Sequence, residues 1–365
     1  MKLLFLVLVA CSARPDVVRK VDPIPDVPAP EAAPAPPFVA PLTWNQGRAD
    51  ETLMRRTPVE RWSTVLGGPV AAPIVTDGTH FFAIAGNRIR CLDDWGKSCW
   101  DLKNDPIGAR FGRGELVVNT RAGALERIHP VAGTVIERLQ APGPGSGLPV
   151  ETPSGWRWVA GGALQGGAAP ITVGTAVGNL AADGERVFVA VTEGRVLAVE
   201  GGAVVWDTSL GRPPIGGVTL SETRIYVPIA SVGGQPGGLV ALNRDGQELW
   251  RTPTDQEPAA AASVVGNLLV FADRDGYVYG LNADTGEVRW KVEGFSGFVS
   301  QPYWFGSGAW VGNDDGKLYR IDMDDGTVAT TISLGASVTG APVVSKGIFV
   351  VGLANGRVVG LVDGG

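Results

Sequence analysis

The clearest pattern in the chain is an alternation of short apolar runs and tight turns, and its best copy spans residues 267–290. Leu268 to Ala272 is an apolar run of the length typical of a buried strand. Asp275-Gly276 follows as a predicted two-residue hairpin turn, because Asp and Gly tolerate the positive φ that such turns require. Three further runs surround this turn, at residues 261–265, 277–281 and 287–290. The pattern predicts a four-stranded antiparallel meander.

The unit recurs along the chain. Its copies align at the position four residues after the glycine of the last turn in each unit. In the clearest copies this position is occupied by Trp100, Trp206, Trp250 and Trp290. Glu137 and Thr330 occupy it in weaker copies, and one degenerate copy surrounds residues 156–160. The copies lie roughly 40 residues apart, which is the length of a four-stranded propeller blade.

The last unit supplies the prediction for ring closure. Residues 342–361 contain apolar runs for three strands only, and a matching fourth run with its own tryptophan lies at Val59–Trp62. An N-terminal strand that completes the last blade removes the open edge of the ring. We therefore predict an all-β fold over residues 59–365. It is an eight-bladed β-propeller of four-stranded antiparallel blades, and the N-terminal strand closes the ring.

The residues before this body have a different character. Residues 1–10 combine Lys2 with an apolar run too short to span a bilayer, so we predict a signal peptide. The string that ends in Cys11 resembles a bacterial lipobox, in which the cysteine is lipidated; an ordinary signal with a chance cysteine is the alternative. Residues 11–58 then form a proline-rich tether, since proline disrupts both helix and sheet. Ser12 after the cysteine favours the outer membrane, with the protein on the periplasmic face and held by the lipid anchor only.

Composition narrows the classes of function. A net charge of −6 argues against a nucleic-acid-binding protein, since such proteins usually carry a net positive charge or a basic patch. Two histidines, His80 and His129, leave little material for histidine-based catalysis or a histidine-rich metal site, and we expect both to be structural. We see no nucleophile motif and no phosphate loop in the sequence. The expectation is a non-catalytic protein without a cofactor, a metal site or catalytic residues.

Residues 237–250 and 276–290 resemble quinoprotein-type propeller repeats (PQQ-like repeats), in which the tryptophan and the turn glycine hold neighbouring blades together. Among these, the predicted lipoprotein with a single propeller is similar to the propeller lipoproteins of the outer-membrane β-barrel assembly machinery. The resemblance implies a scaffold that docks the POTRA domains of the barrel insertase, alongside its accessory lipoproteins, as a monomer within a hetero-complex. Two alternatives stay open: a scaffold of another envelope complex or a binder of a cell-surface ligand, and a quinone-dependent dehydrogenase. The dehydrogenases carry an adjacent cysteine pair that this sequence lacks.

The resemblance also implies a docking site. In these lipoproteins a loop between the fourth and fifth repeats and an acidic residue on the next loop contact the insertase. The corresponding positions here are Arg212, Pro213, Pro214, Ile215 and Glu257. The first loop is shorter than in the family and lacks its paired leucines, so the alternative is that Arg212 and Glu257 are ordinary solvated charges.

Cys91 and Cys99 flank one predicted hairpin turn. Residues opposite each other on paired strands have Cβ atoms ~4.5–5.5 Å apart, close to disulfide reach, and the periplasm is oxidising. We predict a Cys91–Cys99 disulfide; two small buried thiols are the alternative.

Overall fold

A computed structural model describes residues 56–364, apart from residues 72, 294–295, 299 and 307. The predicted signal peptide, Cys11 and nearly all of the tether lie outside the described residues. Within the described residues, thirty-two strands form eight four-stranded antiparallel sheets. The same part of the chain contains no helix long and apolar enough to cross a membrane.

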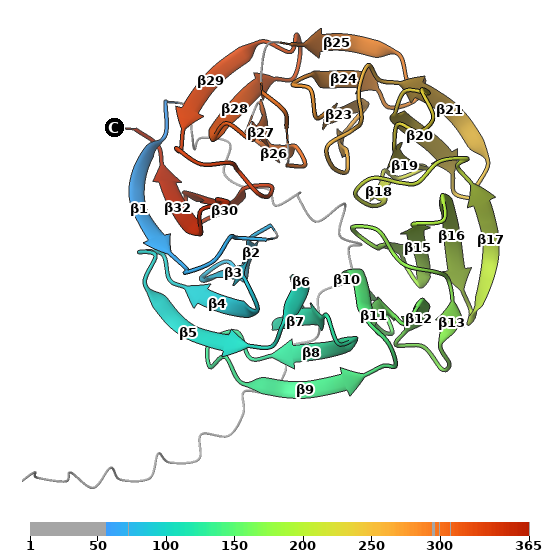
Figure 1. The fold of residues 1–365 in the computed structure, drawn as a ribbon, viewed down its shortest axis with the longest axis horizontal. Coiled ribbons are helices and arrows are strands. Elements are labelled where there is room, and N and C mark those ends of the chain that lie inside the picture. Colours follow the sequence, from blue (N-terminus) through green and yellow to red (C-terminus); the bar gives the residue numbers. More distant parts are fainter. Residues whose placement is uncertain (1–55, 72, 294–295, 299, 307, 365) are drawn as a thin grey trace, which may run out of the picture. The chain divides into compact units, whose positions relative to one another are not determined.

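The sheets follow one another around a ring, and each is a blade of a propeller (Figure 1). Blade 1 comprises β2–β5 (Val75–Thr76, Phe81–Ala85, Arg88–Leu92, Ser98–Lys103). Blade 2 comprises β6–β9 (Pro106–Gly112, Glu115–Thr120, Ala124–Ile128, Val135–Gln140). Blade 3 comprises β10–β13 (Gly145–Thr152, Gly155–Ala160, Ala163–Gln165, Ile171–Thr172). Blade 4 comprises β14–β17 (Ala181–Asp183, Arg186–Val191, Arg195–Glu200, Ala203–Ser209).

The second half of the ring repeats this order. Blade 5 comprises β18–β21 (Thr219–Leu220, Arg224–Ile229, Gly238–Asn243, Glu248–Pro253). Blade 6 comprises β22–β25 (Ser263–Val265, Leu268–Ala272, Val278–Asn282, Val288–Val292). Blade 7 comprises β26–β29 (Tyr303–Phe305, Gly308–Gly312, Lys317–Asp322, Val328–Ser333). Blade 8 comprises β30–β32 (Val343–Ser345, Ile348–Gly352, Arg357–Val362) and β1 (Val59–Val65).

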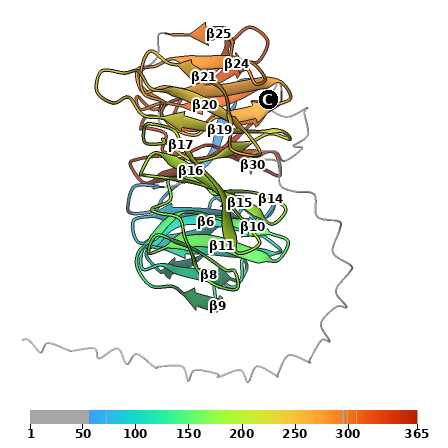
Figure 2. The ribbon, with the colours of Figure 1, turned by 90° about the vertical axis from the view of Figure 1, so that its right-hand side faces the viewer.

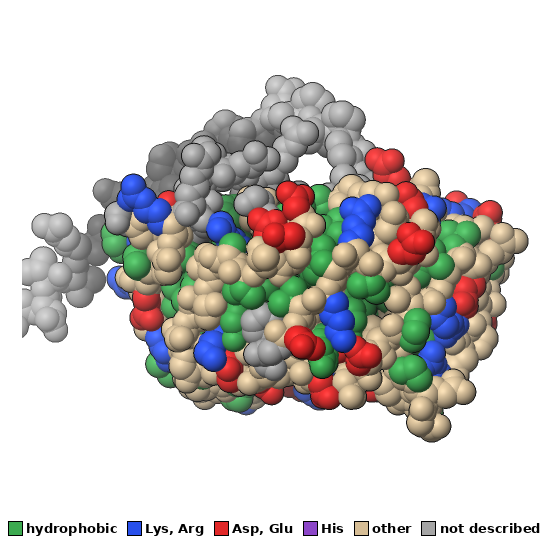
Figure 3. Space-filling model, turned by 90° about the horizontal axis from the view of Figure 1, so that it is seen from above, with side chains coloured by type: hydrophobic (Ala, Val, Ile, Leu, Met, Phe, Trp, Pro, Cys, Tyr) green, Lys and Arg blue, Asp and Glu red, His purple; other side chains and the backbone are tan. Residues whose placement is uncertain are grey.

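The predicted ring closure is confirmed. Strand β1 pairs antiparallel with β32, from Val59 opposite Val362 to Val65 opposite Arg357, and the two strands lie side by side in Figure 1. The two middle strands of each blade are largely buried because both of their faces pack against neighbouring blades, as in the all-buried β23 and β31. The outermost strands face solvent; on the part of the rim seen in Figure 3, acidic and basic side chains alternate with apolar ones.

The aligned tryptophans join neighbouring blades. Each indole Nε1 donates a hydrogen bond to a backbone oxygen in the next blade, and each ring covers the turn glycine of that blade. For Trp290 the acceptor is the Met323 oxygen at 3.0 Å, and a Cβ built on Gly326 would lie 2.7 Å from the ring. We call this arrangement a tryptophan lock. Its other members are Trp62 to Asp94, Trp100 to Pro130, Trp206 to Arg244 and Trp250 to Ala283.

A β-bulge directs each lock. The outer strand of blade 4 pairs Trp206 with Ala198 and Val204 with Val199, so Val205 is the extra residue. A bulge bends its strand and re-aims a side chain, here the tryptophan, toward the next blade. The extra residue faces solvent, and for this reason Val205 is 48% exposed. Blade 1 has the same bulge, and its extra residue is Cys99.

One local prediction is wrong, and the degenerate copy around residues 156–160 is confirmed as blade 3. The turn at Asp275-Gly276 is not a two-residue hairpin, since β23 ends at Ala272 and β24 begins at Val278. The carboxylate of buried Asp273 explains the longer loop, because its Oδ1 accepts hydrogen bonds from the backbone N–H groups of Asp275 and Tyr277 at 3.1 and 2.9 Å. The degenerate blade 3 does have four strands, but its outermost strand, β13, is only two residues long.

Candidate interaction face

The two loops that the sequence indicated lie on one face of the ring. In an antiparallel blade, successive connections alternate between the two faces, which Figure 2 shows edge-on. Arg212 to Ile215 lie between β17 and β18, and Glu257 lies between β21 and β22. Both segments connect one blade to the next, so both emerge on the same face.

Backbone pairing fixes the first loop. The Ile215 N–H donates to the Pro228 oxygen, and the Ala230 N–H donates to the Pro213 oxygen, each at 2.8 Å. These bonds hold Pro214 opposite Ile229, where Pro214 is buried. Pro213 is left exposed and Ile215 half-buried. The loop is therefore a rigid support that presents Pro213 to solvent.

Arg212 reaches sideways along this face. Its Nη1 donates to the backbone oxygen of Pro236, in the connection between β19 and β20. Burial and the nearby positive charge of Arg251 lower the pKa of Arg212. Arg251 in turn donates to the Leu210 oxygen at 3.2 Å, so two guanidinium groups flank the start of the loop.

Glu257 is held in a similar way from the other side. Its carboxylate lies 3.3 Å from Nε of Arg274, and its backbone oxygen accepts from the Arg274 N–H at 3.0 Å. A Cβ on Gly237 would lie 2.8 Å from Pro258 and 3.2 Å from the Glu257 Cα, so the 231–237 connection packs directly on this loop. The structure thus places Arg212 and Glu257 on either side of one exposed loop.

These contacts define a continuous surface, which we call the docking face: residues 210–215, 231–237 and 254–258. Sequence reasoning missed its central part, residues 231–237, and the supporting residues Arg251 and Arg274. The glycine-rich insertion at 231–238 was the available signal, because an extra loop on a repeat maps to one face of the ring.

Asp255 adds a polar cluster at the edge of the docking face. It pairs with the ammonium group of Lys291 and lies 3.2 Å from the Tyr279 hydroxyl. The hydrogen bond from Lys291 is the main cause that lowers the pKa of Asp255. Lys291 also lies over the ring of Tyr277, 3.8 Å from its centroid. Charges of both signs alternate here, an arrangement suited to a protein partner with complementary charges.

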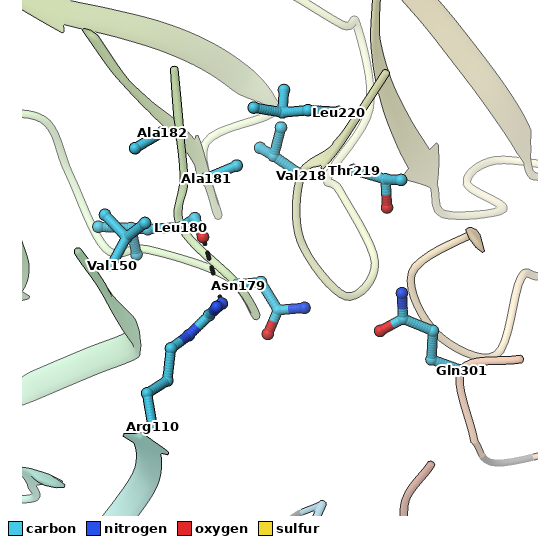
Figure 4. A pocket seen from close by; sticks show the side chains of 10 residues that line it. All are labelled: Arg110, Val150, Asn179, Leu180, Ala181, Ala182, Val218, Thr219, Leu220 and Gln301. Carbon is cyan, nitrogen blue, oxygen red and sulfur yellow. Dashed lines mark hydrogen bonds between the residues drawn. The ribbon is translucent and has the colours of Figure 1, made fainter. Parts of the chain in front are cut away.

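A small cavity opens among the inner strands of blades 2 to 5 (Figure 4). Its volume is about 40 Å³, far below the ~300–1,000 Å³ of typical small-molecule sites. Arg110 from β6 points toward it and donates to the Leu180 oxygen at 3.4 Å, while Asn179 and Gln301 face it from other loops (Figure 4). Burial lowers the pKa of Arg110 to about 10. Sequence reasoning did not single out Arg110, because a single arginine within a strand matches no known binding or catalytic motif.

Cys91 and Cys99 are close but not bonded to each other in the structure. Cys91 is buried opposite Trp100, whereas Cys99, the bulge residue, is exposed. Burial raises the pKa of the Cys91 thiol. The disulfide between them stays a prediction, which a count of free thiols in the unfolded, unreduced protein tests: none is expected, and two would contradict it.

Five tryptophans of the described residues lie outside the lock position, and all but Trp95 are buried. Trp156, Trp158, Trp304 and Trp310 are buried, while Trp95 in a turn of blade 1 is 67% exposed. The Arg61 guanidinium lies 4.0 Å from the Trp95 ring centroid. Trp95 is on the face opposite the docking face, because it lies in the connection between β4 and β5 of its blade.

A protein-family model described as outer membrane protein assembly factor BamB matches residues 154–291 and 235–365, together more than half of the chain. The chain belongs to the BamB family. The docking face lies entirely within the matched residues. BamB from Yersinia pestis is 26% identical over 227 residues, covering 52% of this chain and 56% of that protein. The chain therefore spans little more than half the length of this relative.

Two further comparisons concern the fold and a relative that is named as an enzyme. The crystal structure of BamB from Moraxella catarrhalis matches with a TM-score of 0.51 and 16% identity, covering 86% of this chain and 95% of that one, and shows a shared fold. A beta-alanine-activating enzyme from Danio rerio is 29% identical over 115 residues, covering 29% of this chain but only 10% of the enzyme. A stretch similar to part of this chain thus also occurs within a protein named as an enzyme.

Proposed function

We propose that the protein is a non-catalytic scaffold that assists the assembly of outer-membrane β-barrel proteins. The observation that carries the proposal is the BamB family match, which includes every residue of the docking face. The scaffold binds the POTRA domains of the barrel insertase through this face. Arg212 and Glu257 set its charge pattern, and exposed Pro213 and the 231–237 loop supply contact area.

The rigidity of the docking face supports this role. Arg212 and Glu257 are held by contacts to the Pro236 oxygen and to Arg274, so less side-chain entropy is lost when a partner binds. Opposite charges on one face favour a partner with a complementary charge pattern and fix its register.

Attachment to the membrane is a further part of the proposal. Cys11 carries the lipid and residues 11–58 hold the propeller on the periplasmic face of the outer membrane. One acyl chain gives only marginal membrane binding, so stable attachment requires more than one. The variant Cys11→Ser is expected to lose metabolic labelling with palmitate and to leave the membrane fraction; unchanged fractionation would contradict the anchor.

The test is a crosslinked pull-down of the tagged protein from detergent-solubilised envelopes of its own bacterium, with partners identified by mass spectrometry. We expect the insertase with its POTRA repeats to dominate, and the double variant Arg212→Glu/Glu257→Arg to reduce its yield at least tenfold. The matched control is Lys97→Glu/Asp245→Arg, which also leaves the net charge unchanged and alters two exposed residues on connections of the opposite face. Enrichment of another envelope complex without the insertase would overturn the proposal.

A further inference from the structure

Blade 1 brings three metal-ligating side chains together at its outer edge. One ligand atom each from His80, Cys91 and Cys99 lies within 4.8 Å of the other two. His80 directly precedes β3, Cys91 lies in β4 and Cys99 in β5, and these strands are neighbours in one sheet. The meander thus gathers three residues that are separated in sequence.

The β-bulge of blade 1 explains why Cys99 takes part. Trp100 is the residue paired with Cys91, and Cys99 is the extra residue beside it. Without the bulge, Cys99 would pair in the ladder and its side chain would take another direction. Cys91 is buried, His80 is half-buried and Cys99 is exposed, so the cluster opens to solvent at one side.

Asp77 orients the imidazole. Its Oδ2 lies 2.9 Å from Nδ1 of His80, and its Oδ1 accepts from the His80 backbone N–H at 2.6 Å. Histidines that bind metals usually donate the second ring N–H to a carboxylate, which fixes the tautomer and the ring orientation. With Nδ1–H donated to Asp77, the lone pair of Nε2 is available to a ligand.

We propose that His80, Cys91 and Cys99 bind a thiophilic cation with a filled d shell, for which Zn²⁺ is the probe, when the two thiols are reduced. This differs from the expectation of no metal site that composition alone gave. In a tetrahedral site with Zn–S ~2.3 Å and Zn–N ~2.0 Å, ligand atoms lie ~3.5–3.8 Å apart. Because these atoms lie within 4.8 Å of one another, each separation has to shorten by at most about 1.3 Å to reach that spacing.

The binding step balances without any redox change. Zn²⁺ forms bonds to both sulfur atoms and to the imidazole nitrogen, the two thiols release their protons to solvent, and water fills the fourth position. The predicted Cys91–Cys99 disulfide uses the same two sulfur atoms. It therefore removes two of the three ligands, and the oxidised protein should not bind the ion.

The experiment titrates Zn²⁺ into the mature chain, reduced with a phosphine so that no thiol buffer competes for the ion, and follows binding by calorimetry. We expect one ion per chain, and protection of the exposed Cys99 thiol from a thiol reagent. Co²⁺ in place of Zn²⁺ should give thiolate charge-transfer absorption. Cys99→Ser and His80→Gln should each weaken binding at least tenfold, and Asp77→Asn should weaken it about tenfold, in the range for a residue that orients a ligand.

The matched control is His129→Gln, which removes the other histidine of the chain from an exposed turn and should leave binding unchanged. The test uses variants of Cys99 and His80, because Cys91 is fully buried and its replacement would disturb the packing of the blade. Absence of stoichiometric binding to the reduced protein would overturn the proposal. Equal affinity in Cys99→Ser, His80→Gln and the parent chain would also overturn it.

Discussion

The junction between blades 6 and 7 and the junction between blades 2 and 3 connect neighbouring blades in different ways. At the first, Trp290 is 8% exposed, donates to the Met323 oxygen and covers Gly326. At the second, the equivalent position is Glu137, which pairs with Arg127. Burial of a large aromatic side chain is worth ~3–5 kcal/mol when judged by truncation, whereas an exposed ion pair is worth ~0–1 kcal/mol.

The surface at the junction of blades 2 and 3 has a charge cluster beside a groove. A groove of about 400 Å³ lies at the junction of blades 2 and 3, lined in part by Glu137, Arg127 and Trp156. Glu115 completes the charge cluster, 2.6 Å from Arg127. The comparison indicates that the locks contribute stability unevenly around the ring. It also explains why the repeat is faint in sequence at this junction, where polar residues replace the apolar lock.

The largest effect is expected from removing the closing strand. Deletion of residues 56–65 removes Trp62 and the pairing with β32, so it should cost more than about 5 kcal/mol of unfolding free energy, of which Trp62 alone accounts for ~3–5. The exposed edge of β32 should also cause self-association. Urea unfolding and size-exclusion chromatography measure both effects. Val65→Ser, at a 69% exposed position of the same strand, is the control and should change stability by less than about 0.5 kcal/mol. A deletion variant as stable as the parent would mean that β1 does not close the ring.

A single lock should account for the next largest effect. Trp290→Ala should lower the free energy of unfolding by ~3–5 kcal/mol, because it removes a buried aromatic ring and leaves a cavity. Thr330→Ala, at the equivalent position of the next blade, should cost no more than about 0.5 kcal/mol. Equal losses in the two variants would contradict the difference between locked and unlocked junctions.

The glycine beneath the tryptophan gives a sharper test. Gly326 has φ +78°, and a Cβ there would lie 2.7 Å from the Trp290 ring. Gly326→Ala should therefore cost ~2–4 kcal/mol, from the left-handed conformation and from displacement of the ring. Gly266 also has a positive φ, but a Cβ there meets nothing within 4 Å, so Gly266→Ala should cost only ~1–2 kcal/mol. Thermal unfolding of the two variants side by side isolates the contribution of the ring contact.

The smallest effect concerns equivalent turns of blades 6 and 7. Burial raises the pKa of Asp273 in blade 6, whereas blade 7 has Asn313 at the same place, accepting from the Lys317 N–H at 2.8 Å. Because the folded-state pKa of Asp273 is raised, its ionisation disfavours folding above that pKa and the penalty disappears at lower pH. Asp273→Asn should thus stabilise the protein at neutral pH, by no more than about 1 kcal/mol, and the gain should vanish in acid. Asn313→Asp should show the opposite sign at neutral pH. Unfolding curves at several pH values measure both, and a gain that grows in acid would be inconsistent with the raised pKa.

Much of the fold could be predicted because its information is local. Apolar runs separated by Asp-Gly turns define hairpins, and the recurring tryptophan marks one position per blade. Ring closure followed from matching a three-stranded unit with the run at Val59–Trp62. The five-residue turn after Ala272 could not be predicted, since it depends on hydrogen bonds from backbone N–H groups of the turn to the Asp273 carboxylate.

The candidate sites were less accessible from sequence for a different reason. Arg212 and Glu257 were indicated by family resemblance, but their common neighbour, the 231–237 loop, is set by packing between blades 5 and 6. In the same way, the approach of His80 to Cys91 and Cys99 depends on the one-residue bulge beside Trp100. Contacts between strands that depend on a one-residue register shift carry no periodic signal in the sequence.

The most direct test of the central claim is to introduce a photo-crosslinking amino acid at Pro213 and, separately, at Asp245 on the opposite face, and to irradiate living cells. We predict that the probe at Pro213 crosslinks to a POTRA domain of the barrel insertase and that the probe at Asp245 does not. Crosslinking to the insertase from Asp245 but not from Pro213 would contradict the docking face. Crosslinking of both probes only to other envelope proteins would contradict the proposed function.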